Sequence, residues 1–466
     1  MGETMTKIAT KIAVACVALS LAVVIFARPT VFPTGTTIYK PDKCWNGFTV
    51  FSANVTGEIT LIDMNGNVVK SWKGISGFPA RLFPGGYIMG YIGTRPMHQD
   101  STALVQADWN GNVVWKFDRA EEIKDPDKTP YWSARQHHDY QREGNPVGYY
   151  APGMDPKTSA GNTLVLAHKD VNNPRISNRL LEDDYIYEVT WDGKIVWEWL
   201  ASDHFDELGL DEAAKNTIFR NPSWNSARGA ADWAHINSMS VLGPNRFYDQ
   251  GDARFHPDNI IVDGRQLNII WIIEKKTGKV VWKVGPDFTA TPELRKLGQI
   301  VGQHHAHMIP KGLPGAGNIM VFDNGGAAGY GSPNPGSVNG VGAAIRANSR
   351  VLEFNPVTLD LVWQYSPETS GMEMTSFFSH YISSAQRLPN GNTLIDEGAD
   401  GRIFEVTAKH EIVWEYISPF FSDAKETQNG VYRAYRVPYE WVPQISKPAE
   451  KAVVPVPNSK MRVSVP

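Results

Sequence analysis

Seven of the twelve histidines in this chain gather in four short clusters. Imidazole rings that lie close together suit two kinds of chemistry. Neutral rings bind a transition metal ion, or one ring attacks an electrophile while other rings, with arginine, hold the developing negative charge. The clusters are WAHIN at His235, QHHAH at His304, His305 and His307, FSHYI at His380, and QHHD at His137 and His138.

The remaining histidines stand alone in the sequence. We interpret them as ordinary surface or turn residues: His98, His168, His204, His256 and His410.

A metal site is permitted by the clusters but not specified by them. Asp139, Asp323 and Glu397 are carboxylates that could complete such a site, but the sequence has no HExxH motif and no closed Cys/His spacing. Buried histidines with purely structural hydrogen bonds are a simpler alternative. We therefore predict no metal and no cofactor.

A repeated β-rich unit must position these clusters. Its clearest copy, residues 384–416, contains a PNGN turn, a GADG turn and the β-prone runs FEVT and IVWEY. Asn-Gly or Asp-Gly between alternating apolar residues is the strongest short hairpin signal. Six copies of a related ending occur along the chain, and their anchor tryptophans are Trp72, Trp115, Trp197, Trp282, Trp363 and Trp414.

The repeat predicts an all-β fold, a six-bladed β-propeller of four-stranded antiparallel blades. The closest copies are spaced as propeller blades are, at roughly 40 to 50 residues. The first strand of each blade lines a central channel, and the histidine clusters come just before the turns that follow these strands. We therefore expect the clusters to converge in the channel.

The register of the clusters makes this expectation more specific. When the turn prolines that follow them are matched, His235, His305 and His380 fall in one column without gaps. Because strand side chains alternate between faces, His307 shares a face with His305 while His304 points the other way.

Two segments depart from the repeat. Residues 118–161 form a long polar insertion that carries His137, His138 and Asp139, and long ordered loops are often functional. Residues 204–219 are the only stretch of the body with a convincing helical pattern.

The ends of the chain are expected to lie outside the propeller. Residues 12–27 are a 16-residue apolar run between Lys11 and Arg28, which predicts an uncleaved signal-anchor helix or a cleaved signal peptide. The predicted divisions are 1–28 for this segment, 29–50 for a linker, 51–442 for the propeller, and 443–466 for a Pro-rich tail that is disordered or laid across the surface. The body would then be periplasmic or otherwise extracytoplasmic, tethered to the membrane by residues 12–27.

Charge and cysteine content exclude some alternatives. A formal net charge of -4 gives no basis for nucleic-acid binding. Cys16 lies inside the apolar run, which leaves Cys44 as the one cysteine of the exported part. An internal disulfide is therefore not expected.

Several longer motifs resemble those of the arylsulfate sulfotransferase family. They are DWAHINS at 232–238, GQHHAH with FDNGG within 302–326, SAQRLPNGNTL at 384–394 and GRIFEVTAKHEIVWEY at 401–416. The resemblance covers nearly everything from 33 to about 442. It implies a propeller that moves a sulfuryl group from an aryl sulfate ester to a phenolic acceptor, through a sulfo-histidine and without a nucleotide donor or cofactor.

The same resemblance implies roles for single residues. His380 is similar in position to the family's nucleophile, and His235 and His305 resemble its sulfate-binding histidines, with His307 as the second choice for His305. The implied substrate-binding residues are Asn324, Asn237, His137, His138 and Arg350.

The sequence departs from the family where an arginine follows the FDNG motif. GGAAGYG stands in its place. The candidates to replace that arginine are Arg346, Arg350, Arg387 and Arg433.

Two functions of other classes stay open. One is a metal-dependent hydrolase or lyase that uses the His137, His138 and Asp139 cluster with His305 and His307. The other is a non-catalytic, membrane-tethered propeller that binds ligands.

Overall fold

A computed structural model describes residues 34–53, 57–95, 98–125, 128–223, 231–422 and 428–455. The signal-anchor predicted at 12–27 and residues 456–466 of the predicted tail lie outside these ranges.

Among the helices of the described residues, none is long and apolar enough to cross a membrane.

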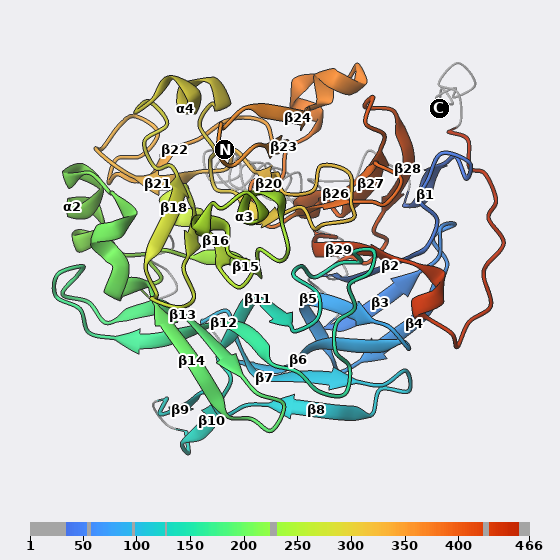
Figure 1. The fold of residues 1–466 in the computed structure, drawn as a ribbon, viewed down its shortest axis with the longest axis horizontal. Helices are drawn as coiled ribbons and strands as arrows, with labels where there is room; N and C mark the ends of the chain where they lie inside the picture. The colour runs from blue at the N-terminus through green and yellow to red at the C-terminus, as the bar shows by residue number, and fades with distance from the viewer. Residues whose placement is uncertain are drawn as a thin grey trace, which may run out of the picture.

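The chain folds into antiparallel sheets arranged around a common centre (Figure 1). Three sheets have four strands each, and from the inside outward they are β29 (Val431–Val437), β2 (Phe48–Ala53), β3 (Glu58–Ile62) and β4 (Val68–Lys73); β15 (Ile236–Val241), β16 (Ile260–Gly264), β17 (Ile269–Ile273) and β18 (Val280–Val284); and β19 (His304–Met308), β20 (Ile319–Asp323), β23 (Arg350–Phe354) and β24 (Leu361–Tyr365). A five-stranded sheet contains β25 (Ser384–Arg387), β26 (Thr393–Glu397), β27 (Arg402–Val406), β28 (Ile412–Ile417) and β1 (Gly35–Tyr39).

The eight-stranded sheet consists of two consecutive meanders. Its strands are β5 (Ser76–Phe83), β6 (Tyr87–Arg95), β7 (Asp100–Ala107) and β8 (Val113–Phe117), followed by β11 (Gln136–Arg142), β12 (Thr163–Val171), β13 (Leu181–Val189) and β14 (Ile195–Leu200). The pairing of Gln136 with Ser101 joins the two meanders. Two small ribbons complete the strands: β9 (Glu121–Ile123) with β10 (Tyr131–Ser133), and β21 (Ala328–Tyr330) with β22 (Val341–Ala344).

The innermost strands close into a circle, which makes the fold a β-propeller. Each contacts the next in the order β29, β5, β11, β15, β19, β25 and back to β29. The C-terminal strand β29 completes the sheet that β2 begins, with Phe48 paired to Val437. Strand β1, in the predicted linker, extends the last sheet by pairing with β28.

The anchor tryptophans tie each meander to the next one. Every indole Nε1 donates a hydrogen bond to a carbonyl in the turn of the following unit: Trp72 to Asp108 (3.2 Å), Trp115 to Trp191 (2.9 Å), Trp197 to Lys275 (2.9 Å), Trp282 to Pro356 (2.8 Å), Trp363 to Ala408 (3.3 Å) and Trp414 to Met64 (2.7 Å). The last bond returns to the start of the chain. The prediction that these tryptophans mark a repeated unit is confirmed.

The described part of the C-terminal segment runs along the edge of the first and last sheets. Val453 forms a β-bridge with Tyr39, and the Lys451 carbonyl accepts a hydrogen bond from Asn65 Nδ2 (2.7 Å).

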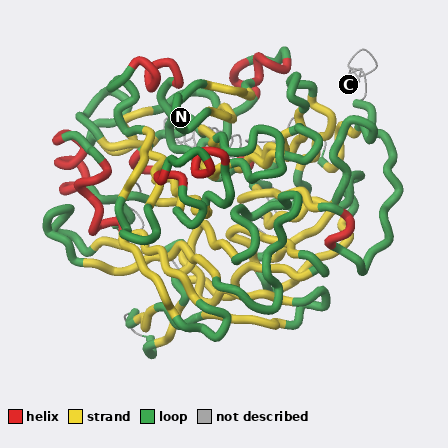
Figure 2. The backbone as a smooth tube through the Cα atoms, in the orientation of Figure 1, coloured by secondary structure: helices red, strands yellow, loops and turns green. Residues whose placement is uncertain are grey.

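Helices are few and short, and α2 and α4 lie at the periphery (Figures 1 and 2). The prediction of one helix over 204–219 is wrong in detail, because Gly209 adopts a left-handed conformation (φ 72°) that ends η1, and Asp211 then caps α2. The helices are η1 (Ala201–Leu208), α2 (Glu212–Arg220), α3 (Arg246–Asp249), η3 (Ala253–Phe255), η4 (Arg265–Leu267), α4 (Pro292–Leu297), η5 (Pro367–Ser370), η6 (Met374–Ser376), η7 (Gly398–Asp400) and η8 (Tyr439–Trp441).

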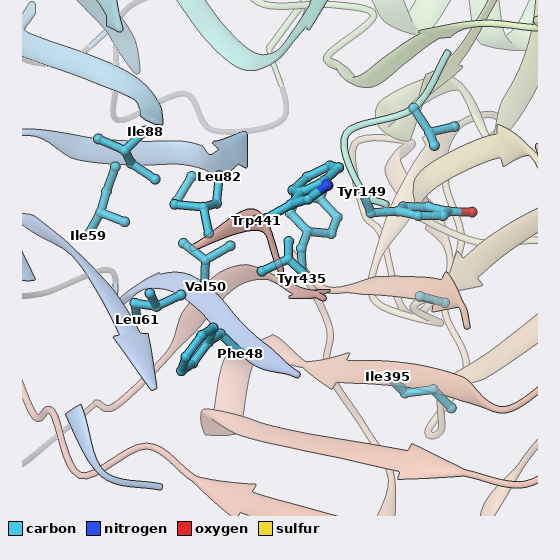
Figure 3. Close-up of a cluster of buried hydrophobic side chains, with 14 of the residues drawn as sticks. Phe48, Val50, Ile59, Leu61, Leu82, Ile88, Tyr149, Ile395, Tyr435 and Trp441 are labelled. Atoms are coloured by element: carbon cyan, nitrogen blue, oxygen red, sulfur yellow. The ribbon is translucent and has the colours of Figure 1, made fainter. Parts of the chain in front are cut away.

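The sheets pack face to face through apolar side chains. Between the β2 and β5 sheets, Val50, Leu61 and Leu82 interlock with Ile59 and Ile88 (Figure 3). These side chains are almost fully buried, and each stabilises the fold by roughly 1.5–3 kcal/mol. This packing fixes the inner strands, and with them the central polar side chains.

Candidate functional site

Three inner strands begin near a histidine whose backbone is left-handed. The φ angle is 50° at His138, 50° at His235 and 56° at His305. The hairpin register shifts beside each of them, and such bulges redirect side chains. Positive φ is uncommon for a residue with a Cβ, and strained backbone of this kind concentrates at functional sites. These positions are therefore where a site is sought.

The structure corrects the expectation that His137, His138 and Asp139 belong to an insertion loop. All three lie on β11, the inner strand of its meander. The segment departs from the repeat because it carries the additional ribbon β9–β10 before β11.

The first group of side chains is centred on His235. Its Nδ1 is hydrogen-bonded to the Asp232 carboxylate by a very short contact. The ring of His138 lies edge-on to that of His235, with centroids 4.7 Å apart. A carboxylate at Nδ1 fixes the tautomer that carries its lone pair on Nε2, which is the arrangement that makes an imidazole a nucleophile or a base.

Arg265 brings positive charge to the same place. Its backbone N–H donates to the His235 carbonyl (3.0 Å), and its guanidinium reaches the carbonyls of Ala327 (3.3 Å) and His380 (3.5 Å). Burial lowers the pKa of Arg265 to about 10, against the opposing attraction of Asp232. The guanidinium therefore stays protonated at neutral pH beside His235.

The histidines beside His235 are neutral at pH 7. Burial, and then the neighbouring His235 ring, holds the pKa of His138 well below its usual range, and burial lowers the pKa of His137 to about 4. The Nδ1 atoms of His137 and His138 are 2.8 Å apart. One ring must therefore donate to the other, and the accepting nitrogen must be unprotonated.

A second polar group, more completely buried, is centred on Asp139. Its carboxylate accepts hydrogen bonds from Arg81 Nη2 (2.5 Å), Arg433 Nη1 (2.8 Å) and the Met239 amide (3.0 Å). Two guanidinium groups share one carboxylate, so this group holds an excess of positive charge.

His305 and His307 lie beside the second group. Their ring centroids are 4.5 Å apart, which confirms that the two side chains share a face. His307 contacts the His305 carbonyl through Nδ1 and Tyr149 Oη through Nε2, each at 2.8 Å. His305 accepts from the Ala385 amide (3.4 Å) and contacts Tyr435 Oη (3.3 Å). Both nitrogens of each ring are thus engaged by the protein itself.

Comparison with known families fits this geometry. The family model described as Arylsulfotransferase (ASST) matches residues 156–417, which is more than half of the chain. The chain belongs to the arylsulfotransferase family. No curated protein matches it in sequence.

Solved structures resemble this arylsulfotransferase-family chain only distantly. A protein of unknown function from Bacteroides caccae has a TM-score of 0.44 and 10% identity, over 84% of this chain and 99% of the other. Virginiamycin B lyase from Staphylococcus aureus has a TM-score of 0.36 and 11% identity, over 82% and 87%. The Dos1 propeller has a TM-score of 0.34 and 9% identity, over 84% and 74%.

His380, matched to the nucleophile of the arylsulfotransferase family, does not lie on a strand. Strand β25 begins only at Ser384, and His380 stands exposed in the bend before it, with its ring 4.5 Å from that of Tyr381. The left-handed residues of this segment are Ile382 and Ser383. The predicted column of His235, His305 and His380 is therefore wrong at its third member, because the chain turns before the strand starts.

The other predicted binding residues are held by the protein. Asn324 bonds His304 Nδ1 (2.7 Å) and donates to the carbonyls of Ser379 (2.7 Å) and Ile382 (2.9 Å), so it fixes the segment that carries His380. Asn237 donates to the Gln303 carbonyl (3.2 Å) and accepts through its own carbonyl from Arg433.

Most of the candidate arginines lie elsewhere. Arg350 pairs with Asp323 (2.6 Å), as Arg346 does (2.9 Å), and both line a surface pocket of about 730 Å³ whose lining includes none of the clustered histidines. Arg387 pairs with Glu353 (2.5 Å). The carboxylate suggested at Glu397 pairs with Arg402 (3.0 Å).

Sequence reasoning missed Arg265 and His168. Arg265 follows β16, and the hairpin pairing of Gly264 with Ile236 is the signal that places it beside His235. His168, interpreted as a surface or turn residue, is only 1% exposed on β12. Its alternation along the apolar strand TLVLAHKDV was the available signal.

Proposed function

We propose that this chain is an aryl sulfotransferase that moves a sulfuryl group from an aryl sulfate ester to a phenol through a sulfo-histidine at the centre of the propeller. The observation that carries the proposal is the Asp232–His235 pair with Arg265 and His138 beside it, in a chain of the arylsulfotransferase family.

The geometry favours His235 as the attacking histidine over the sequence-predicted His380. Its Nδ1 is oriented by a carboxylate, whereas His380 stands exposed in a bend. His235, Asp232 and Arg265 keep 4%, 7% and 6% of their surface exposed, so a sulfate group can reach them without unfolding the site. His380 would then lie on the route to the site and contact the substrate.

Catalysis of sulfuryl transfer depends mainly on positioning and on holding charge, as in phosphoryl transfer. His235 Nε2 attacks sulfur, the sulfur–oxygen bond to the aryl group breaks, and the phenolate leaves with the bonding electrons and takes a proton from water. Asp232 then faces the positive charge of the sulfurylated imidazole, and Arg265 holds the sulfate oxygens. A phenol next attacks sulfur, the nitrogen–sulfur bond breaks with its electrons returning to Nε2, and neutral His138 accepts the phenolic proton.

An aromatic wall beside His138 suits the aryl group. Phe78 is half-buried, with its ring centroid 4.6 Å from that of His138 and 4.2 Å from that of Tyr432. Aromatic rings at this spacing attract one another. The aryl ring of the donor or acceptor would pack on Phe78 while its sulfate faces His235.

His305 and His307, with Asn237 and Asn324, would support this site without touching substrate, since their polar atoms bond the protein. His137 would hold His138 in place. Arg350 would act only at the surface pocket.

We further infer that the propeller has six blades. The closed circle of inner strands and the closed series of tryptophan hydrogen bonds support this count, with the eight-stranded sheet taken as two blades. We also propose that residues 12–27 export the chain and tether it to the membrane, with the propeller over 51–442 outside the cytoplasm. Phenol and aryl sulfate would then be its small-molecule partners.

The test is turnover of a chromogenic aryl sulfate with a phenol acceptor. His235→Ala should lower kcat/KM by about a thousandfold or more, as loss of a nucleophile does, and Arg265→Gln by about a hundredfold. His256→Ala, which removes a surface histidine, is the matched control and should leave turnover unchanged. Wild type that releases no phenol with any donor would refute the proposal, and a His380→Ala variant that loses more activity than His235→Ala would reassign the nucleophile.

A further inference from the structure

Behind His138, the wall formed by β11, β12 and β13 holds polar side chains that the proposed sulfuryl transfer does not use. They are His137, His168 and Asp184, and each is at most 1% exposed. One ligand atom from each lies within 4.8 Å of the others. Each comes from a different strand of the same sheet.

These side chains lack the hydrogen bonds that buried polar groups normally make. His137 Nε2, both ring nitrogens of His168 and Asp184 Oδ1 are without a hydrogen-bond partner among the described residues. A buried donor or acceptor left in this state costs about 1–3 kcal/mol, so several together in one place call for a ligand.

A neighbouring group of acids is already balanced and serves as a comparison. Asp100 and Glu182 also approach His168, with Nδ1 3.8 Å from an oxygen of each. Arg135 donates to Asp100 (2.9 Å) and to Glu182 (3.0 Å). No cation among the described side chains within ion-pair distance neutralises Asp184, whose one ion-pair contact there is with His137.

We propose that His137, His168 and Asp184 bind one divalent transition-metal ion. His137 Nε2 and Asp184 Oδ1 are 3.3 Å apart, which matches the edge of a tetrahedron with metal–ligand distances of about 2.0–2.1 Å. Two imidazoles and one carboxylate select zinc or a similar ion and disfavour magnesium and calcium, which prefer oxygen ligands.

Binding requires a small movement of His168. Its ring now stacks on that of His137, with centroids 3.8 Å apart, so its nitrogen must turn toward the ion. The Asp100 and Glu182 carboxylates near Nδ1 would then orient the ring, as carboxylates commonly do for histidine ligands. The ion would neutralise Asp184 and join three strands behind the His138–His235 pair.

Cobalt titration of the chelator-treated full chain tests the proposal. One equivalent of Co²⁺ should bind with the visible absorption bands of a four-coordinate site, and Zn²⁺ should displace it. Asp184→Asn and His168→Gln should lose the bands. His307→Gln, at a buried histidine outside the group, and Glu182→Gln, in the balanced group, should keep them.

The outcomes separate this proposal from the sulfotransferase proposal. Wild type that binds no Co²⁺, or a His168→Gln variant that binds it unchanged, would overturn the metal site whatever the turnover. If the ligand variants fail to fold, the wild-type titration decides alone. Stoichiometric cobalt in a chain that turns over no aryl sulfate would support the ion and refute only the proposed function.

Discussion

Burial of His307 makes the stability of the propeller depend on pH. Burial lowers the pKa of His307 from 6.5 to about 4, although a hydrogen bond to the His305 carbonyl opposes the shift. Because the folded value is the lower one, the unfolded chain takes up a proton first as the pH falls. The stability is complete above the unfolded-state value and is lost progressively between pH 6.5 and about 4. From about pH 7 to about pH 5, His307 alone should cost about 2 kcal/mol of unfolding free energy.

Urea unfolding at these two pH values measures the effect. His307→Gln removes the titrating ring, so its loss of stability between the two pH values should be smaller than that of wild type by about 2 kcal/mol. The other buried histidines titrate in both proteins and cancel in the difference. His256→Gln is the matched control, because the side chain of His256 is 44% exposed. A His307→Gln variant with the same pH dependence as wild type would refute this account of the buried ring.

Three further predictions follow from other contacts. Asp139→Asn leaves two buried guanidinium groups with a neutral partner and should lower the unfolding free energy by about 3–5 kcal/mol, whereas Asp258→Asn at the surface should change it by less than about 0.5 kcal/mol; equal effects in urea unfolding would contradict the network. Phe78→Ala should raise KM for an aryl sulfate by roughly tenfold with little change in kcat, and an unchanged KM would remove Phe78 from the aryl site. Trp414→Phe removes a buried 2.7 Å hydrogen bond that closes the ring and should cost about 1–3 kcal/mol, more than Trp363→Phe, whose 3.3 Å bond is exposed; thermal unfolding compares the two.

The fold was largely predictable because its signals are local. Hairpin turns and anchor tryptophans recur in the sequence, and each tryptophan bonds the next turn as the repeat implies. Strand β11 escaped this reading because its hairpin with β12 spans residues 143–162 without a short turn. The same gap concealed that His137 and His138 lie on an inner strand.

The site was less predictable because side chains from different strands build it. The motif DWAHIN places Asp232 and His235 three residues apart, so their pairing was within reach of the sequence. Arg265 comes from the next hairpin, and only the register of β16 brings it there. Simple alternation failed where bulges insert residues before Ser238 and Tyr140, and it could not show that the chain turns between His380 and β25.

The claim that His235 carries the sulfuryl group can be tested most directly by mass spectrometry. Wild type mixed with an aryl sulfate and quenched in alkali should show one sulfuryl adduct on the peptide that contains His235. The adduct should vanish when a phenol is added and should be absent from His235→Ala. An adduct on the His380 peptide, or rapid turnover with no adduct on any histidine, would contradict the account.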